Sequence, residues 1–205
     1  MTPAEKSAER LWTRSRRAAY AEITDVAMGL FLSEGFDATT IDDIARASGI
    51  SRRSFFRYFG TKEDIVVDEL VQEGEKAARA LEARPDSEPP WAALRAVVLD
   101  IAGAVQGDER MLAVSTMMYE TPSLRSRCIE KHLRWQEQLA PELRRRLSRG
   151  HAEALELDVR ARSLAACAVA CWDSAGEAWT RAEGGVPLAE LLEAAFDAVG
   201  AADGA

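Results

Sequence analysis

Apolar residues recur at every third or fourth position along most of this chain, the spacing that places them on one face of a helix. After the proline-rich stretch RPDSEPP, no segment alternates apolar and polar residues between hairpin turns, as a strand would. The pattern therefore predicts an all-α protein of about nine helices, over residues 16–34, 40–47, 52–59, 61–81, 91–105, 108–119, 121–148, 158–183 and 188–199.

The stretch TTIDDIARASGISRRSFFRYFGTK, residues 39–62, carries the clearest local signals. Thr39 or Thr40 can cap a helix, and an aspartate follows three residues later, as in a capping box. Gly49 supplies the positive φ that a sharp turn needs, and Ser51 can cap a second, short helix. This order of helix, tight turn and helix is the sequence form of a helix-turn-helix.

The second helix of this pair is expected to have an apolar and a basic face. Phe55 and Phe59 are four residues apart and can anchor it on the inner side. The outer side is left with Arg52, Arg53, Ser54, Phe56, Arg57 and Tyr58. Arginine and serine suit base edges and phosphates, so we expect this helix to bind double-stranded DNA. The alternative is an αα-hairpin with a solvated basic face, which needs no partner.

Residues from about 20 to 70 resemble the DNA-binding domain of the TetR family of bacterial transcriptional regulators. The resemblance lies in the segments SEGFDATT, IDDIARASGIS and FFRYFGTKED and in the long helix after them. It implies an N-terminal three-helix helix-turn-helix domain and a C-terminal helical domain that binds an effector and dimerises. The implied function is that of a sequence-specific repressor, which binds a palindromic operator as a dimer and is released by a ligand.

The same resemblance implies roles for single residues. Phosphate contacts are expected at Thr40, Tyr58 and Lys62, and Phe56 shares this surface. Base contacts are expected at Arg52, Arg53, Ser54 and Arg57. Family members commonly have a small residue where Arg53 stands, so Arg53 is expected to add a contact specific to this protein's operator. Asp42 lies where some relatives place a base-reading basic residue, and its carboxylate would repel phosphate, so it is assigned no DNA contact.

The charge of the chain is distributed unevenly. The whole chain has a net charge of -8, which at first argues against a nucleic-acid partner. Residues 1–62, however, carry ten basic and eight acidic side chains, and residues 63–205 carry 16 basic and 26 acidic ones. A mildly basic segment before an acidic one can orient a molecule on DNA. We therefore predict a DNA-binding domain at 1–62, with a frayed N-terminal arm over 1–13, and an effector-binding and dimerisation domain at 63–205.

Composition predicts the compartment. The chain has no run of about 18 apolar residues and no apolar core behind its charged N-terminus, so neither a membrane span nor a secretory signal is expected. Three cysteines without a CxxC spacing fit free thiols in a reducing compartment. We expect the protein in the bacterial cytoplasm, and at the nucleoid when it is bound to DNA.

The second domain is rich in bulky side chains that suit an adaptable apolar cavity. The candidate pocket residues are Trp91, Met111, Met117, Met118, Trp135 and Trp172, with Asp173 as a polar anchor. Ordinary core packing is the alternative for each of them. The segments TPSLRSR, RLSRG and AWTRAEGGVPLAELLEAAF resemble a subgroup of the family found in mycofactocin-system regulators. That resemblance implies an acyl-CoA-like or other small hydrophobic effector.

The last two predicted helices, about 158–183 and 188–199, differ in composition from the others. The first of them has small residues nearly all round between 165 and 175, which permits another helix to approach closely. In the family such a pair forms a four-helix bundle with a second copy, so we expect a homodimer through these helices. The alternative is that the pair closes the core of the monomer.

Neither catalysis nor a cofactor is expected. The only histidines, His132 and His151, lie in no recognisable nucleophile motif, and the chain has no phosphate-cradling glycine loop. The rival to a small-molecule effector is metal or thiol sensing by the i, i+4 pairs Cys128 with His132 and Cys167 with Cys171. A regulator without an effector, or an activator, is also consistent with the sequence.

Overall fold

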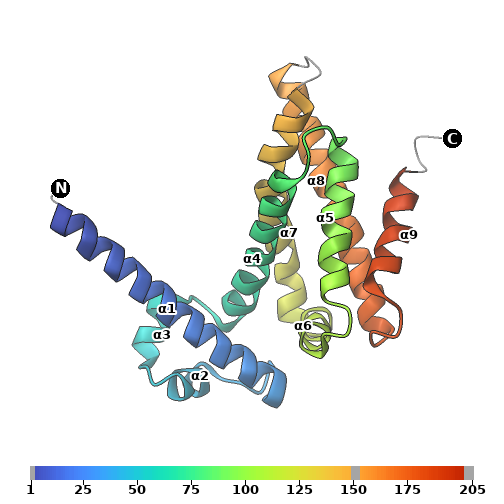
Figure 1. The fold of residues 1–205 in the computed structure, drawn as a ribbon. Helices are drawn as coiled ribbons and strands as arrows, with labels where there is room; N and C mark the ends of the chain where they lie inside the picture. Colours follow the sequence, from blue (N-terminus) through green and yellow to red (C-terminus); the bar gives the residue numbers. More distant parts are fainter. Residues whose placement is uncertain (1–2, 149–152, 201–205) are drawn as a thin grey trace. The chain divides into compact units, whose positions relative to one another are not determined.

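The computed structural model describes residues 3–148 and 153–200, with side chains from residue 16 on (Figure 1). These residues form helices and no strands, which confirms the predicted all-α class. No described helix is both long and apolar enough to cross a bilayer. The helices are α1 Pro3–Glu34, α2 Ile41–Ala47, α3 Arg52–Tyr58, α4 Lys62–Ala83, α5 Pro90–Ala104, α6 Glu109–Glu120, α7 Pro122–Leu147, α8 Ala154–Arg181 and α9 Leu188–Gly200.

The chain divides into two compact units, which we call the head, up to Glu69, and the body, from Leu70 on. The division falls inside α4, so one continuous helix belongs to both units. A functional boundary between residues 62 and 63 remains a prediction.

The first helix is longer than the sequence pattern suggested. It was expected to begin at about Arg16 after a frayed arm, but α1 begins at Pro3. The arm over 1–13 is therefore a wrong prediction for residues 3–13, and Met1 and Thr2 lie outside the described residues. The physical reason is local: the segment AEKSAERLW consists almost entirely of good helix formers, and Pro3 suits the first helical position.

The tight geometry of the head follows from its caps. Thr40 accepts a hydrogen bond from the Asp43 amide, and the Asp43 carboxylate accepts one from the Thr40 amide, forming the predicted capping box. Gly49 has a φ of +65°, the left-handed conformation that the turn requires. The Ser51 hydroxyl then accepts from the Ser54 amide and starts α3. These caps fix α2 and α3 through short-range contacts alone.

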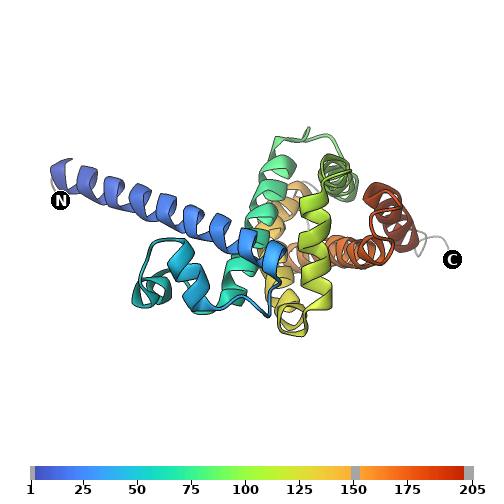
Figure 2. The same cartoon turned by 90° about the horizontal axis from the view of Figure 1, so that it is seen from below.

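In the body, α7 and α8 pack side by side (Figure 1), and α9 packs against α5 and α8 (Figure 2). The core holds leucine and valine side chains of α5, Phe196 of α9 and small residues of α8. The small residues buried here are Ala165, Ala168, Cys171 and Ala175. These four residues therefore belong to the core of the body, and a dimer surface on α8 and α9 remains a prediction. Their small volume lets α8 approach its neighbours closely.

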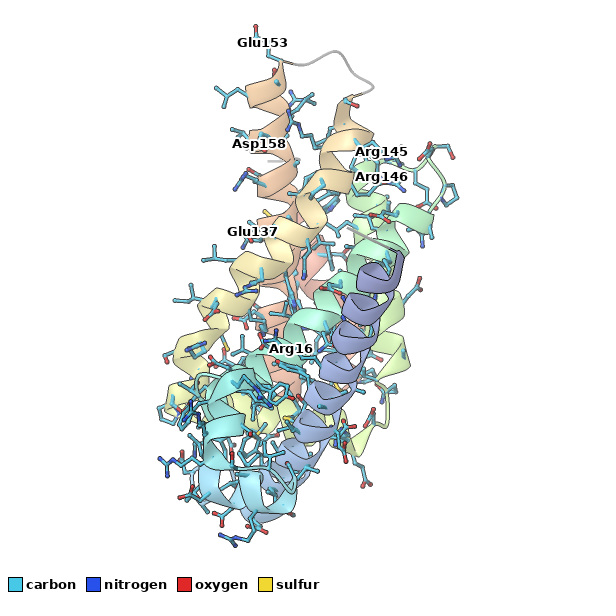
Figure 3. The ribbon with its side chains drawn as sticks, turned by 90° about the vertical axis from the view of Figure 1, so that its left-hand side faces the viewer. Arg16, Glu137, Arg145, Arg146, Glu153 and Asp158 are labelled. Atoms are coloured by element: carbon cyan, nitrogen blue, oxygen red, sulfur yellow. The ribbon has the colours of Figure 1, made fainter. Side chains whose placement is uncertain are left out.

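The loop between α4 and α5 contains the proline-rich stretch and is held at its base. Arg84 donates two hydrogen bonds to Glu88 across the loop, with N–O distances of 2.5 and 2.8 Å. The buried Arg146 of α7 donates to the carbonyls of Leu81, Arg84 and Pro85, and Figure 3 shows it beside this loop. Pro141 lies within α7, and the helix continues past it to Leu147.

Candidate DNA interface and ligand cavity

The recognition helix α3 is anchored on its inner side by aromatic packing. Phe55 and Phe59 are buried, and their ring centroids lie 5.5 Å apart. Tyr20 of α1 stacks against Phe59 at 4.5 Å and donates a hydrogen bond of 2.6 Å to Asp68 of α4. Burial raises the pKa of Tyr20, reinforced by Asp68, so the phenol remains a donor at neutral pH. Within the head, α3 is thus fixed to α1 and α4.

The outer side of α3 is basic and exposed. Arg53 and Arg57 are exposed, and neither forms an ion pair with another described residue. The Arg57 guanidinium lies 5.3 Å from the ring of the half-buried Tyr58. Phe56, 47% exposed, projects from the same side. The half-buried Ser54 is occupied locally, because its hydroxyl lies 3.0 Å from that of the capping Ser51.

Arg52 differs from its neighbours because it is paired. Its Nη1 donates to both carboxylate oxygens of Asp42, at 3.1 and 2.9 Å, and both side chains are more than half exposed. The carboxylate neutralises one of the cations that were expected to read bases. Arg53 and Arg57 therefore remain the stronger candidates for base contacts, and Asp42, which is paired with Arg52, is still assigned no DNA contact.

Thr40 and Lys62, both expected to contact phosphates, also hold the head together. Thr40 is the exposed N-cap of α2. The Lys62 ammonium donates to the Phe36 carbonyl at 2.6 Å and to the Thr39 carbonyl at 3.1 Å, and lies 4.3 Å from the centroid of the Phe36 ring. Two of the three N–H donors of the Lys62 ammonium are therefore used inside the head. Phosphate contacts by Thr40 and Lys62 remain a prediction.

Replacing Lys62 by Met is expected to lower the free energy of unfolding by about 1–3 kcal/mol, because two carbonyls lose a charged donor. The measurement is chemical denaturation of the whole chain followed by circular dichroism. If Lys62 also contacts phosphate, the variant binds all DNA sequences more weakly, and the slope of log K against log salt falls by about 1. Lys76→Met, which removes an exposed lysine of the same helix, is the control. Unchanged stability would contradict the structural role.

The body contains a cavity of about 280 Å³ among α4, α5, α6, α7 and α8. Four of the predicted pocket residues line it: Met111, Met118, Trp135 and Trp172. Trp135 and Trp172 meet edge to face at 6.1 Å. A second, apolar cavity of about 50 Å³ shares Glu73, Ile101, Trp135 and Trp172 with the first. The walls thus combine an apolar recess with a larger, partly polar space.

The other three predicted pocket residues lie elsewhere. Trp91 packs against Phe196 in the core of the body, with ring centroids 5.0 Å apart, and Met117 is buried outside the lining. Asp173 does not line the cavity but contacts a residue that does. It accepts a hydrogen bond of 3.0 Å from the hydroxyl of Tyr119, a lining residue, and lies 3.2 Å from Nε2 of His132.

The neighbours of Asp173 and Tyr119 shift the pKa values of these two residues. His132 holds the pKa of Asp173 below its usual range, with smaller contributions from Tyr119 and the Lys131 charge, against the effect of burial. Burial raises the pKa of Tyr119, and Asp173 adds to this, so the phenol stays protonated. Asp173 is therefore an ionised carboxylate that orients Tyr119 at the cavity wall.

Sequence reasoning missed Lys131, which is only 5% exposed and lines the larger cavity. A lysine on a basic helix is normally solvated, so the residue type did not indicate that Lys131 is buried. Its register did carry a signal. Lys131 follows Leu124 and Cys128 by seven and three residues and precedes Trp135 by four, and these three residues belong to the buried stripe of α7.

The cysteine pairs show no metal site in the part of the chain that is described. No group of three or more His, Cys, Asp or Glu side chains there could hold a metal ion. Cys128 and Cys171 are buried, and burial raises the pKa of both thiols, which disfavours the reactive thiolate. The geometry thus favours small apolar packing residues over a sensor.

Comparison with known proteins relates both units to one family. Residues 23–68 match the model of the bacterial regulatory proteins of the tetR family, and residues 88–203 match that of the MftR C-terminal domain. The chain is 33% identical over 193 residues to MftR, a proposed mycofactocin biosynthesis transcriptional regulator of Mycobacterium tuberculosis, with 92% of each chain covered. It is 28% identical over 175 residues to the HTH-type transcriptional regulator TcmR of Streptomyces glaucescens, covering 80% of this chain and 76% of TcmR.

The fold has counterparts among solved structures. It is similar, with a TM-score of 0.61 and 23% identity, to the crystal structure of Thermus thermophilus FadR, a TetR family transcriptional repressor in complex with lauroyl-CoA. That alignment covers 87% of this chain and 91% of the FadR chain. The family matches over both units and the 33% identity to MftR establish that this protein belongs to the TetR family of bacterial transcriptional regulators, with a C-terminal domain of the MftR type.

Proposed function

We propose that this regulator is a repressor that binds a palindromic operator as a dimer and is released when a small apolar molecule occupies the cavity of the body. The observation that carries the DNA-binding part is α3 itself. Its aromatic side is buried in the head, and Arg53 and Arg57 are exposed without an acidic partner among the described residues. A short rigid helix with free arginines suits the major groove of B-DNA.

A footprint on the intergenic DNA upstream of the protein's own gene tests this part. We expect a protected palindrome whose half-sites are centred about 34–36 Å apart or a multiple of it. Protection should disappear when the palindrome is scrambled at constant composition. A footprint that is absent, or that is indifferent to scrambling, would contradict operator recognition at this site.

The release part rests on the continuity of α4. This helix begins at Lys62, directly after the helix-turn-helix, and its residues Leu70, Glu73 and Lys76 line the cavity. Trp135 donates to the Leu70 carbonyl at 2.9 Å, and Gly74 leaves room for the same indole. A ligand that moves Trp135 therefore acts on α4. To shift the protein from mostly operator-competent to mostly incompetent, the ligand must prefer the second state by about 5.5 kcal/mol.

The effector class comes from the similar proteins, since FadR of Thermus thermophilus is a repressor in complex with lauroyl-CoA. Adding lauroyl-CoA to the preformed operator complex is the direct test, with free coenzyme A as the control. Release by the conjugate and not by coenzyme A supports an acyl effector. An operator complex that survives saturating acyl-CoA and a series of apolar molecules would contradict ligand release.

The dimer interface is proposed to centre on the outward face of α8. Val159, Ser163, Ala170 and Ser174 are exposed there at helical spacing, so a helix of a second copy can approach closely. On the α7 side the exposed Leu133 continues this surface, and a groove of about 390 Å³ between α7 and α8 includes Glu137 and Asp158 (Figure 3). Helix α9, the last helix that the structure describes, follows α8 and completes the pair of helices expected at the interface.

Ala170→Arg is expected to weaken the dimer at least about 100-fold, because a twofold axis brings two bulky cations to one interface. Sedimentation velocity over a concentration series measures the dissociation constant. Ala113→Arg, at an exposed alanine of α6, should leave the dimer intact. Equal behaviour of the two variants would remove the α8 stripe from the interface.

A further inference from the structure

The body buries one cation that has no direct ion-pair partner among the described side chains, although the charge of Asp173 acts on it from a distance. Lys131 lines the larger cavity and is 95% buried, yet it forms no ion pair or hydrogen bond with a described residue. Its Nζ lies 4.7 Å from the centroid of the Trp135 ring, a contact through the face of the indole. An ammonium group removed from water without a carboxylate is costly, and burial correspondingly lowers the pKa of Lys131.

The two acidic residues of the lining, Glu73 and Asp108, and the adjoining Asp173 are each engaged with another partner. Asp173 accepts from Tyr119 and faces His132. Glu73 accepts a hydrogen bond of 2.6 Å from Lys76, which is mostly exposed. Asp108 accepts from the Met111 amide as the N-cap of α6. Lys131 is therefore the cation in the lining that is left for a negative group brought in from outside.

Aromatic side chains form part of the lining that contains Lys131. Trp135, Trp172 and Trp179 stand in the same lining, and the recess of about 50 Å³ opens beside Trp135 and Trp172. At about 280 Å³ the larger cavity lies at the lower end of the range for small-molecule sites, about 300–1,000 Å³. One buried cation in such a space matches a single negative charge. Coenzyme A, by contrast, carries several phosphate charges, while its thioester carbonyl carries none.

We propose that this cavity binds a small amphipathic carboxylate, with the carboxylate on Lys131 and the apolar part among the tryptophans. The assignment rests on the proposed function, because it names the chemical class of the effector that acts at the same site. It predicts that the free acid, rather than an uncharged analogue of equal length, is the preferred ligand. The carboxylate draws the ammonium away from the Trp135 ring, whose indole donates to the Leu70 carbonyl of α4.

The test compares the full-length protein's affinity for dodecanoate and for dodecan-1-ol, measured below their aggregation limits by isothermal titration calorimetry. Octanoate and 1-naphthoate extend the series to shorter and aromatic acids. We expect dodecanoate to bind about 10- to 100-fold more tightly than the alcohol, the effect of a charged hydrogen bond in a dry site. Equal affinity for acid and alcohol, or no binding of any of the three acids, overturns the proposal.

Lys131→Met keeps the length of the side chain and removes its charge. The preference for dodecanoate should vanish in this variant, while the affinity for the alcohol is retained. Its melting temperature should be equal to or above that of the parent, because a buried charge is gone. Arg134→Met, which removes an exposed cation of the same helix outside the cavity lining, should keep the preference. Retention of the full preference by Lys131→Met also overturns the proposal.

The same ligands, added to the operator complex, separate this inference from the proposed function. If dodecanoate binds through Lys131 but leaves the operator bound, the carboxylate site stands and ligand release by it fails. If lauroyl-CoA releases the operator while dodecanoate and dodecan-1-ol bind equally, release stands and the carboxylate site fails. The two claims therefore fail independently.

Discussion

Arg146→Met is expected to lower the free energy of unfolding of the body by about 3–5 kcal/mol, the usual cost of breaking a buried ion pair on one side. The side chain of Arg146 is 1% exposed. It donates to Glu142 at 2.8 Å and to three backbone carbonyls at the end of α4 and in the following loop, at 2.8–3.0 Å. Methionine fills much of the same space but removes the charged donor from all three carbonyls and leaves Glu142 with Arg145 alone.

Arg145→Met is the matched control for this substitution. Arg145 is the neighbouring residue of α7 and also donates to Glu142, but it is about half exposed and can be replaced by water. Its loss should therefore cost much less stability. Urea denaturation followed by circular dichroism measures both variants. If the two lose the same small amount, the carbonyl contacts of Arg146 do not hold the loop between α4 and α5.

Arg53→Ala is expected to weaken operator binding by about 1–3 kcal/mol per half-site, which over the two half-sites of a dimer corresponds to a loss of roughly 30-fold to 10⁴-fold. The reason is that Arg53 is exposed on α3 and free of acidic partners among the described residues. A guanidinium in that state can bind two acceptors on a guanine edge without first breaking an ion pair.

The loss should be selective for sequence. On random DNA, Arg53→Ala should change the affinity by no more than the loss of one cation explains, since base contacts carry the specificity. Arg46→Ala is the control, because Arg46 is an exposed arginine of α2 that is already paired with Asp43 at 2.9 Å. Titrations of operator and random duplexes by fluorescence anisotropy give both numbers. Equal losses on the two DNAs would exclude base reading by Arg53.

The head could be predicted closely because its geometry is set by neighbouring residues. The capping box of Thr40 with Asp43, the left-handed Gly49 and the cap at Ser51 all act within three or four positions. Their spacing in the sequence is therefore sufficient to place α2 and α3. The resemblance to TetR regulators rested on the same segment, and the family matches confirm it.

The body was less predictable, because its side chains are sorted by packing between distant helices. Trp91 was assigned to a pocket because its side chain is large. In the structure it packs against Phe196 where α5 contacts α9. Lysine and arginine side chains are mostly exposed in proteins, yet Lys131 and Arg146 are both buried. Their partners lie far away in sequence or, as we propose for Lys131, come from a ligand. Only their register with the apolar stripe of α7 indicated burial.

The small residues of α8 show the limit of composition as a guide. Ala165, Ala168, Cys171 and Ala175 serve the core of the body, whereas Ala170 faces outward on the same helix. A helix with small residues on every face can be approached closely on every face. The composition alone therefore does not indicate which face packs within the monomer and which contacts a second copy. The structure separates the two faces, and only the outward one remains available to a second copy.

The most direct test of the account is a titration of the full-length protein against its own upstream intergenic DNA and against random DNA of equal length. Both titrations are run at about 50 and 200 mM salt, the range over which phosphate contacts weaken strongly. We predict that both affinities fall with salt, while the intergenic DNA stays at least about 10³-fold tighter. Equal affinity for the two DNAs at both salt concentrations would contradict a sequence-specific role for α3.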